Sequence, residues 1–405
     1  MKRLPHVGVL AMLLFGAFCL ASCRQEDGAA LQRVDLFSLD IGPAEDQLSL
    51  FDFPDDPVLP RAGIAMRDGL FYISDGGGRK LARYNSFGDL LFLVFNDRTN
   101  PVPGDLRVRE MDEDGQMTRW AYTFPFRSPG LIVVDSRRDI FVEEILPEEQ
   151  WVTDPETRAL HDGVVLRFDP DGRFLGHIGQ GGPGGGPFPR IMGLAGSVDD
   201  EVAVLCRLAE GDWEIFWFND RGEQLFLVRV LKENIPPAPG FPDSFGSIDA
   251  VIPAPDERRL YVKVDYYREI VDGFSGNLLG IESLNSHVWF VDLEGGGFET
   301  SVRLPFYEFE FAERGERQTV DLPYSLLGAV RNGGLLFFTQ TEGGYAVLRI
   351  GADGEGQRRG FIEVEPERVL FNSFHLSEDG VLSALLADET SVAVSWWRME
   401  DFMND

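Results

Sequence analysis

The sequence predicts an all-β fold made of many short strands, and three features of the chain indicate it. It has 45 glycines and 24 prolines among 405 residues, and glycine makes up only roughly 7 % of an average chain, so tight turns should recur along its length. Apolar residues make up 44 % and aromatic residues 12 %, which is enough for a large packed core and excludes a disordered chain. Short apolar runs separated by Asp-Gly turns repeat, as in antiparallel meanders.

The start of the chain is expected to be an export signal followed by a tether. A basic start precedes an apolar stretch at residues 7–18, which is short for a membrane span. Residues 20–23, Leu-Ala-Ser-Cys, resemble the lipobox of bacterial lipoproteins, in which the cysteine receives a diacylglycerol. The resemblance implies a signal peptide over residues 1–22, a lipidated Cys23 and a short tether over 23–30. An ordinary signal peptide with a chance cysteine is the alternative.

Two residues bear on the expected location and on thiol chemistry there, Arg24 and Cys206. Arg24 follows the cysteine, where many lipoproteins retained at the inner membrane have Asp, so an extracytoplasmic position at the outer membrane is predicted. Cys206 is then the one cysteine left in an oxidising compartment, and no intrachain disulfide can form. It lies in a strand-like apolar run, so we expect a buried, unreactive thiol.

One unit repeats along the chain from about residue 61. The clearest copy has strand-like runs at 60–65, 70–75, 81–84 and 90–94, with Asp68-Gly69 at the first turn. Such a unit is a four-stranded antiparallel meander. Further copies begin near Pro129, Ile191, Ile248, Leu327 and Phe374.

The sixth copy has only three strands before the chain ends, the last at residues 392–397. The run at 33–39 belongs to no other copy and can supply the missing outer strand. Closing a ring in this way protects sheet edges that an open array would expose. Residues 31–405 are therefore predicted to form a six-bladed β-propeller of four-stranded antiparallel blades, closed by an N-terminal strand that joins the last blade.

The copies resemble NHL-type six-bladed propellers over nearly all of the chain after the leader. The first copy has the Pro-x-x-Gly-Ile-Ala spacing at 60–65 and Tyr-Ile-Ser-Asp at 72–75, and residues 178–190 resemble the glycine-rich crossing between blades. Lipoproteins of this type commonly serve as envelope scaffolds. The resemblance therefore implies a binding or assembly role.

The parity of a four-stranded meander predicts which face of the propeller binds. Antiparallel strands place the a–b and c–d turns on one face and the b–c and d–a links on the other, and insertions that gather on one side usually mark the binding side. Four aromatic residues in these links are candidates for ligand contact: Trp120, Trp151, Tyr266 and Tyr267. The alternative is that the inserts pack on one another as a lid. The inserts are residues 96–127, 143–163, 231–246, 265–286 and 305–324.

Three arginines precede the innermost strands of the first three copies at equivalent positions: Arg61, Arg127 and Arg190. They are predicted to surround the channel mouth, where they would bind a carboxylate or phosphate of a ligand or of an envelope protein. The alternative is internal pairing with carboxylates, for which Asp249 is one candidate.

Composition and motifs limit the function classes. A formal net charge of −30 repels phosphate backbones and excludes nucleic acid as a partner. The histidines lack metal-ligand spacing and no Gly-x-Ser-x-Gly motif occurs, so neither a metal site nor a catalytic residue is assigned. Some propeller hydrolases and lactonases hold calcium at the channel, so a metal-dependent hydrolase remains the alternative to a binding scaffold.

Overall fold

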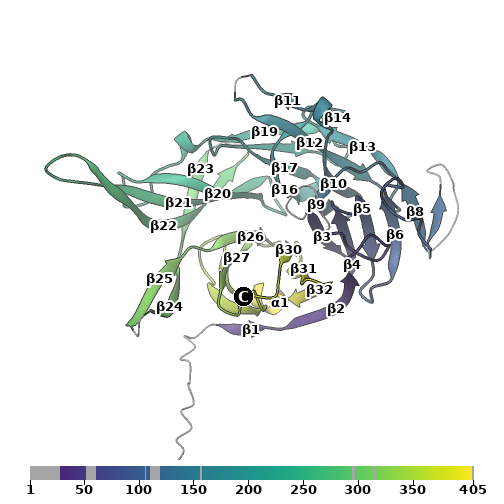
Figure 1. Cartoon of the computed structure of the whole chain (residues 1–405). Coiled ribbons are helices and arrows are strands. Elements are labelled where there is room, and N and C mark those ends of the chain that lie inside the picture. The colour runs from purple at the N-terminus through teal and green to yellow at the C-terminus, as the bar shows by residue number, and fades with distance from the viewer. Residues whose placement is uncertain are drawn as a thin grey trace, which may run out of the picture.

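The computed structural model describes residues 28–51, 61–104, 106–109, 119–155, 157–293, 297–313 and 316–403. Small, mostly antiparallel sheets follow one another around a central axis, as in a β-propeller (Figure 1). The predicted signal peptide and Cys23 lie outside the described residues, so the lipid anchor stays a prediction. Among the residues described, no helix has the length and apolarity needed to cross a membrane.

Five sheets are built around four strands in chain order, as the repeats predict. Short turns join the strands of each pair, because Asp-Gly and related turn residues alternate with apolar runs. We number these sheets 1 to 5. Their strands are β3 (Ala62–Arg67), β4 (Leu70–Asp75), β5 (Lys80–Tyr84) and β6 (Leu90–Phe95) in sheet 1; β9 (Pro129–Val134), β10 (Ile140–Ile145), β12 (Leu160–Phe168) and β13 (Phe174–Gly179) in sheet 2; β16 (Ile191–Gly196), β17 (Val202–Arg207), β18 (Trp213–Phe218) and β19 (Gln224–Val230) in sheet 3; β20 (Phe245–Pro253), β21 (Arg259–Val271), β22 (Leu278–Asp292) and β23 (Phe298–Leu304) in sheet 4; and β26 (Ser325–Ala329), β27 (Gly334–Thr341), β28 (Gly344–Gly351) and β29 (Arg358–Glu363) in sheet 5.

Sheet 6 combines the two ends of the chain. Three strands follow one another, β30 (Phe371–Leu376), β31 (Val381–Ala387) and β32 (Ser391–Arg398). The N-terminal β2 (Arg33–Asp40) pairs antiparallel with β32, so the predicted pairing of the first strand with the last is confirmed (Figure 1). The blade count is five and not the predicted six, and among the described residues five sheets have four strands that follow one another in the chain.

Shorter elements complete the fold, and several extend the sheets at their edges. β8 pairs parallel with β6 and β7 with β8, so part of the insert at 96–127 belongs to sheet 1. β1 pairs parallel with β29. These elements are β1 (Ala29–Leu31), β7 (Arg107–Arg109), β8 (Trp120–Thr123), β11 (Val152–Thr153), β14 (Gly182–Pro183), β15 (Phe188–Pro189), the separate hairpin β24 (Tyr307–Glu313) and β25 (Glu316–Leu322), the 3-10 helices η1 (Glu148–Gln150), η2 (Val198–Asp200) and η3 (Lys232–Asn234), and α1 (Glu400–Met403).

The apolar core lies in the junctions between successive sheets. Each of the six clusters of buried side chains joins one sheet to the next. The cluster between sheets 6 and 1 contains Leu385 and Val394 together with Phe71 and Ile73. Strand alternation explains this arrangement, because every sheet presents one row of side chains to each neighbour.

Two of the predicted inserts project from the ring as hairpins (Figure 1). β21 and β22 pair as far as Val271 and Leu278, beyond the ends of β20 and β23. β24 and β25 form a two-stranded sheet of their own. Long links on the b–c and d–a side therefore do build surface outside the blades, as the parity of the meander predicts.

Candidate functional site

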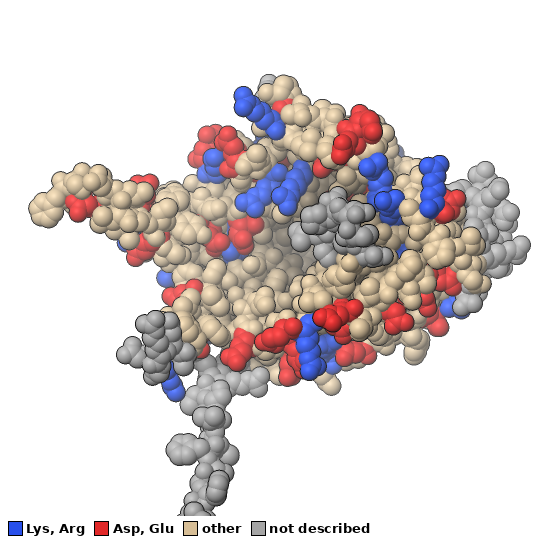
Figure 2. Space-filling model, in the orientation of Figure 1, with Lys and Arg blue, Asp and Glu red and all other residues tan. Residues whose placement is uncertain are grey.

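The innermost strands of all six sheets surround an axial cavity of about 840 Å³. Figure 2 shows the molecule hollowed near its centre, where uncharged residues prevail. The wall combines apolar side chains with charged and polar ones, among them Asp249 and His375. Its apolar side chains include Ile64, Met66, Ile132, Leu194, Val251 and Phe374.

Irregular strand pairing puts one residue from each of four sheets into this wall. The register of the innermost strand shifts in sheets 2, 3, 4 and 5, next to Leu131, Met192, Asp249 and Leu327. All four residues line the cavity. A β-bulge inserts an extra residue and re-aims its side chain, so these bulges explain how three apolar groups and one carboxylate come to face the axis.

A buried lysine holds the carboxylate of Asp249. The Nζ of Lys263 lies 2.9 Å from Asp249 Oδ2 and 2.9 Å from Asp265 Oδ1, and its side chain is 1 % exposed. The Ser286 hydroxyl donates to Asp265. A buried ammonium needs carboxylate partners, so the pair fixes Asp249 at the wall with its second oxygen, Oδ1, directed to no other described group.

His375 provides a neutral hydrogen-bond donor at the wall. Its Nδ1 accepts the backbone N–H of Met66 at 3.4 Å, so Nε2 carries the ring proton. Burial lowers the pKa of His375 to about 4, and the ring is uncharged at neutral pH. Among the described residues no hydrogen-bond partner is seen for Nε2, and His375 lines the cavity.

Charged pairs surround the cavity at the end where the a–b turns lie. Arg67 pairs with Glu378 at 2.6 Å, and Arg331 pairs with the same carboxylate at 2.7 Å. Asp68 and Asp379, which also line the cavity, belong to these turns. The opening at this end is therefore charged.

None of the three predicted arginines lines this cavity. Burial raises the pKa of the Asp162 carboxyl group, and Arg61 and Arg190 both act on that group and oppose the rise. Arg61 pairs with Glu143 at 2.7 Å, and the ion pair lies against Gly130 of β9, where a Cβ would meet both groups at 2.4 Å. Arg61 therefore fits the alternative given above, in which these arginines pair with carboxylates inside the protein. Arg127 and Arg190 have exposed side chains, and Asp249 pairs with Lys263 instead.

Glu144, which no sequence motif singled out, is the most perturbed carboxyl group beside Arg61. Its Oε1 accepts the backbone N–H groups of Arg127 and Ser128 at 2.8 Å each. Its Oε2 is buried without a hydrogen-bond partner among the described residues. Burial raises the pKa of Glu144 to about 7 against the lowering effect of these bonds and of Arg61, so the group titrates near neutral pH.

The four candidate aromatic residues divide into two buried and two accessible side chains. Trp120 is buried in the junction between sheets 1 and 2, and Tyr266 is buried, its hydroxyl accepting from Trp289 Nε1 at 2.7 Å and donating to the Pro236 carbonyl at 2.8 Å. The expected exposure is wrong for these two, because β8 and β21 place them in the core. Trp151 is 36 % exposed, and Tyr267 is half-buried beside Phe245, so both stay candidates.

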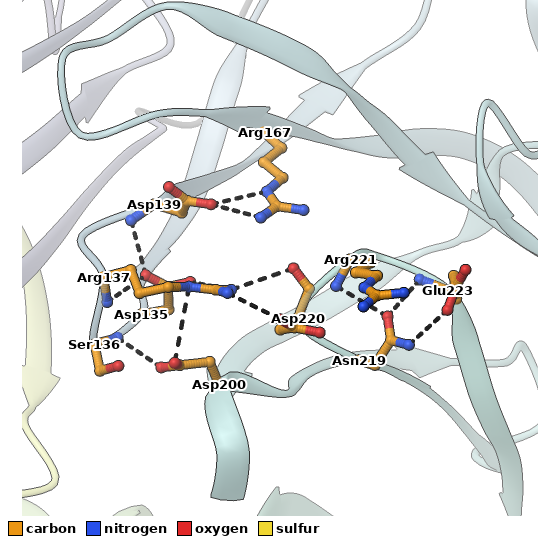
Figure 3. Close-up of polar contacts among 10 residues, drawn as sticks. All are labelled: Asp135, Ser136, Arg137, Asp139, Arg167, Asp200, Asn219, Asp220, Arg221 and Glu223. Carbon is orange, nitrogen blue, oxygen red and sulfur yellow. Dashed lines mark hydrogen bonds and ion pairs between the residues drawn. The ribbon is translucent and has the colours of Figure 1, made fainter.

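A second charged cluster links sheets 2 and 3 on the short-turn face (Figure 3). Arg137 Nη1 lies 2.9 Å from Asp220 Oδ2, its Nη2 3.3 Å from Asp135 Oδ2, and its Nε 3.8 Å from Asp200 Oδ2. The backbone N–H of Ser136 donates to Asp200 at 2.8 Å. The cluster joins turns of neighbouring sheets, so we assign it to the structure of the ring.

Two further predictions concern cysteine and metal. Cys206 is fully buried, which confirms the predicted burial. Burial raises the pKa of its thiol, and the low reactivity expected of such a group stays a prediction. Within the described ranges, no group of three or more His, Cys, Asp or Glu residues is placed to hold a metal ion.

Comparison with known proteins adds likeness of shape only. No family model matches the chain, and no curated protein matches its sequence. One similar solved structure is XC5397 from Xanthomonas campestris, described as a gluconolactonase, with 12 % identity, a TM-score of 0.41, and coverage of 90 % of this chain and 99 % of that one. Another is apo AztD from Citrobacter koseri, with 12 % identity, a TM-score of 0.31 and coverage of 76 % of each chain. At these values no activity follows from either likeness, and the sheets themselves identify the fold as an all-β propeller.

Proposed function

We propose that the chain is a lipid-anchored, extracytoplasmic binding scaffold of the bacterial envelope, and that its axial cavity is the ligand site. The carrying observation is the wall of the cavity, where bulges direct Leu131, Met192, Asp249 and Leu327 toward one space of about 840 Å³. Small-molecule sites are concave, mostly apolar and supplied with a few fixed polar groups. This cavity is concave and holds fixed polar groups beside its apolar side chains, although its lining is more polar than that of most such sites.

The polar groups of the wall suit a ligand with an apolar body and two polar positions. A ligand acceptor would bind the Nε2–H of His375, and a ligand donor would bind Oδ1 of Asp249. Both groups are held by other contacts, His375 through Met66 and Asp249 through Lys263. Pre-organised groups of this kind keep the entropy cost of binding low.

The proposal includes a sixth blade formed by sheet 6 with β2 as its outer strand. The pairing of β2 with β32 and the apolar junction between sheets 6 and 1 support it. Such a blade would hold the two ends of the chain together and cover the edge of β32. It would also keep all six innermost strands at fixed distances around the ligand.

Anchoring by Cys23 is tested by cell fractionation. The wild-type chain should partition with outer-membrane markers. The Cys23→Ala variant should appear in the soluble extracytoplasmic fraction, because the acyl chains are lost. Unchanged membrane partition of the variant would contradict the anchor.

Ligand binding is tested by titrating the purified chain with the neutral apolar fluorophore N-phenyl-1-naphthylamine. The probe should gain fluorescence on binding the wild-type chain, and Met192→Trp, which places a larger side chain in the cavity, should weaken binding by about tenfold. Leu225→Trp, on the outer strand β19 and 37 % exposed, is the matched control and should bind as wild type. Equal binding by both variants would remove the cavity as the site.

A metal-dependent hydrolase or lactonase is the alternative function, with calcium as its candidate cofactor. Metal analysis of the purified chain separates it from a binding scaffold. Stoichiometric calcium that is retained through gel filtration, with lactone hydrolysis lost on chelation, would favour the enzyme.

A further inference from the structure

We propose that the projecting hairpin β24–β25 is a docking site for an extended segment of a partner protein, which adds to the edge of β24 as a third strand and alternates basic with apolar side chains. This site lies outside the axial cavity and is independent of the ligand proposed for it. The proposal rests on the strand edge, the aromatic face and the unneutralised carboxylates of the hairpin.

The hairpin lacks the support that stabilises the other strands. β24 and β25 pair from Tyr307↔Leu322 to Glu313↔Glu316 and form a separate two-stranded sheet. Within the described part of the chain, Glu308–Phe311 have no strand partner other than β25. Two-stranded hairpins are marginally stable alone, and a third strand or a packed face stabilises them. The edge of β24 is therefore open to strand addition.

Strict alternation gives the hairpin one aromatic and one acidic face. Successive side chains of a strand point to opposite sides, so Phe309 and Phe311 share a face, and their rings lie 6.2 Å apart. Val320, opposite Phe309, is 42 % exposed on that face. Apolar side chains of an added strand would extend this row and cover it.

The acidic face carries more negative than positive charge, because Glu308, Glu310 and Asp321 share it with one arginine, Arg317. Glu308 lies directly opposite Asp321, and like charges in that position destabilise a strand pair. Glu308, Glu310 and Asp321 are exposed, and no ion pair to them is found among the described residues. Basic side chains of an incoming strand would relieve the repulsion.

The same charges decide against a second copy of this chain as the occupant. Two β24 edges brought together would place Glu308 and Glu310 beside their own counterparts, and like-charge juxtaposition costs several kcal/mol. Edge charges of this kind are a known device against self-association. The same carboxylates therefore favour a basic partner strand and disfavour β24 of a second copy of this chain.

The other projecting hairpin does not share this pattern. On β21–β22 the nearest charges are paired, Arg268 with Glu282 at 2.6 Å, and its strands continue into the four-stranded sheet 4. Its tip holds the fully exposed Phe274 beside Asp272. This hairpin supplies Glu269, one of the two positions of the control variant.

The test titrates the purified full chain with a capped nine-residue peptide of alternating lysine and valine, followed by fluorescence anisotropy. Binding should fall about tenfold or more in the Glu308→Lys/Glu310→Lys variant. A Glu233→Lys/Glu269→Lys variant changes two exposed carboxylates outside the hairpin, and so has the same net charge but should bind as wild type. A peptide of alternating glutamate and valine should prefer the Glu308→Lys/Glu310→Lys variant over wild type.

Hydrogen exchange reports whether the peptide adds a strand. With the lysine–valine peptide bound, amides in residues 307–322 should exchange more slowly than in the free chain. Three results would each overturn the proposal. The peptide binds without that protection, the two charge variants lose peptide affinity equally, or the free chain gains the same protection by dimerising as its concentration rises. Loss of naphthylamine binding in the cavity variants leaves these results unaffected, so the two proposals fail separately.

Discussion

The junctions between sheets and the wall of the axial cavity are built from the same strands but differ in the burial and the polar contacts of their side chains. In the junctions, large side chains such as Trp217 and Trp397 are fully buried, and charged turns are joined by ion pairs such as those of Arg137 (Figure 3). At the wall, Met192 is 39 % exposed and the Nε2 of His375 has no described partner. The junctions therefore join neighbouring sheets, while the wall leaves side-chain groups uncovered, as the proposed ligand site requires.

The bulges show how one strand serves both purposes. In β20 the register shifts between Ile248 and Ala250. Ile248 is buried in the junction between sheets 3 and 4, whereas Asp249 lines the cavity. Without the bulge, successive side chains of the strand would point alternately into the two neighbouring junctions.

The largest expected effect comes from removing the strand that joins the two ends of the chain. Deletion of residues 31–39 removes most of β2 and exposes the edge of β32, so the chain should aggregate or fail to fold. Light scattering after gel filtration measures this. Replacing residues 271–279, the tip of the β21–β22 hairpin, with Asn-Gly is the control of similar size and should leave a folded monomer. A monomeric deletion variant with unchanged melting would contradict the role of β2.

A pair of truncations sharpens the contrast between junction and wall. Trp397→Ala opens a void in the junction between sheets 5 and 6 and should lower the free energy of unfolding by about 3 to 5 kcal/mol. Met192→Ala at the wall should lower it by less than about 1 kcal/mol. Urea denaturation of both variants gives the comparison. Similar losses would mean that the wall, too, is needed for stability.

Glu144 predicts a dependence of stability on pH. Its folded-state pKa of about 7 is raised from the usual value of 4.5, so between these values the folded chain binds more protons than the unfolded chain, and this contribution to stability falls as pH rises. Glu144→Gln keeps an acceptor for Arg127 and Ser128 and should increase the free energy of unfolding at pH 8 by roughly 2 to 3 kcal/mol relative to wild type. At pH 4 the two chains should be similar. A gain that is independent of pH would contradict the raised pKa.

The smallest effect is expected at the Arg137 cluster. Its guanidinium is 44 % exposed, and ion pairs of exposed groups contribute little because water screens them. Arg137→Gln should lower the free energy of unfolding by about 0.5 kcal/mol and leave naphthylamine binding unchanged. A loss of binding without a loss of stability would extend the ligand site to the short-turn face.

Local patterns made much of the fold predictable. Turn residues and alternating apolar runs identify the strands around Asp68-Gly69 and in the later copies, since both signals lie within a few residues. The run at 33–39 was assigned to the last sheet by elimination, and β2 lies there. The apolar neighbours of Cys206 predicted its burial.

The candidate site could not be predicted from the sequence, because it depends on contacts between residues far apart in the chain. Trp120 is buried because β8 adds in parallel to β6, and Tyr266 because β21 continues past the expected end of the strand. Asp249 reaches the wall through a bulge, and its partner Lys263 lies on the next strand. No spacing in the sequence reports such bulges or pairings, so the wall became visible only in three dimensions.

Photo-crosslinking with a diazirine-bearing long-chain alcohol tests the central claim most directly, because it reports where an apolar ligand lies. After irradiation of the purified chain, peptide mass spectrometry should find the label on Leu131, Met192 and Leu327 at the wall, and naphthylamine should compete it away. Phe274 and Ile281 of the β21–β22 hairpin are more exposed than Met192 and offer the opposite outcome. Label confined to that hairpin, with the wall unmodified, would contradict a ligand site in the axial cavity.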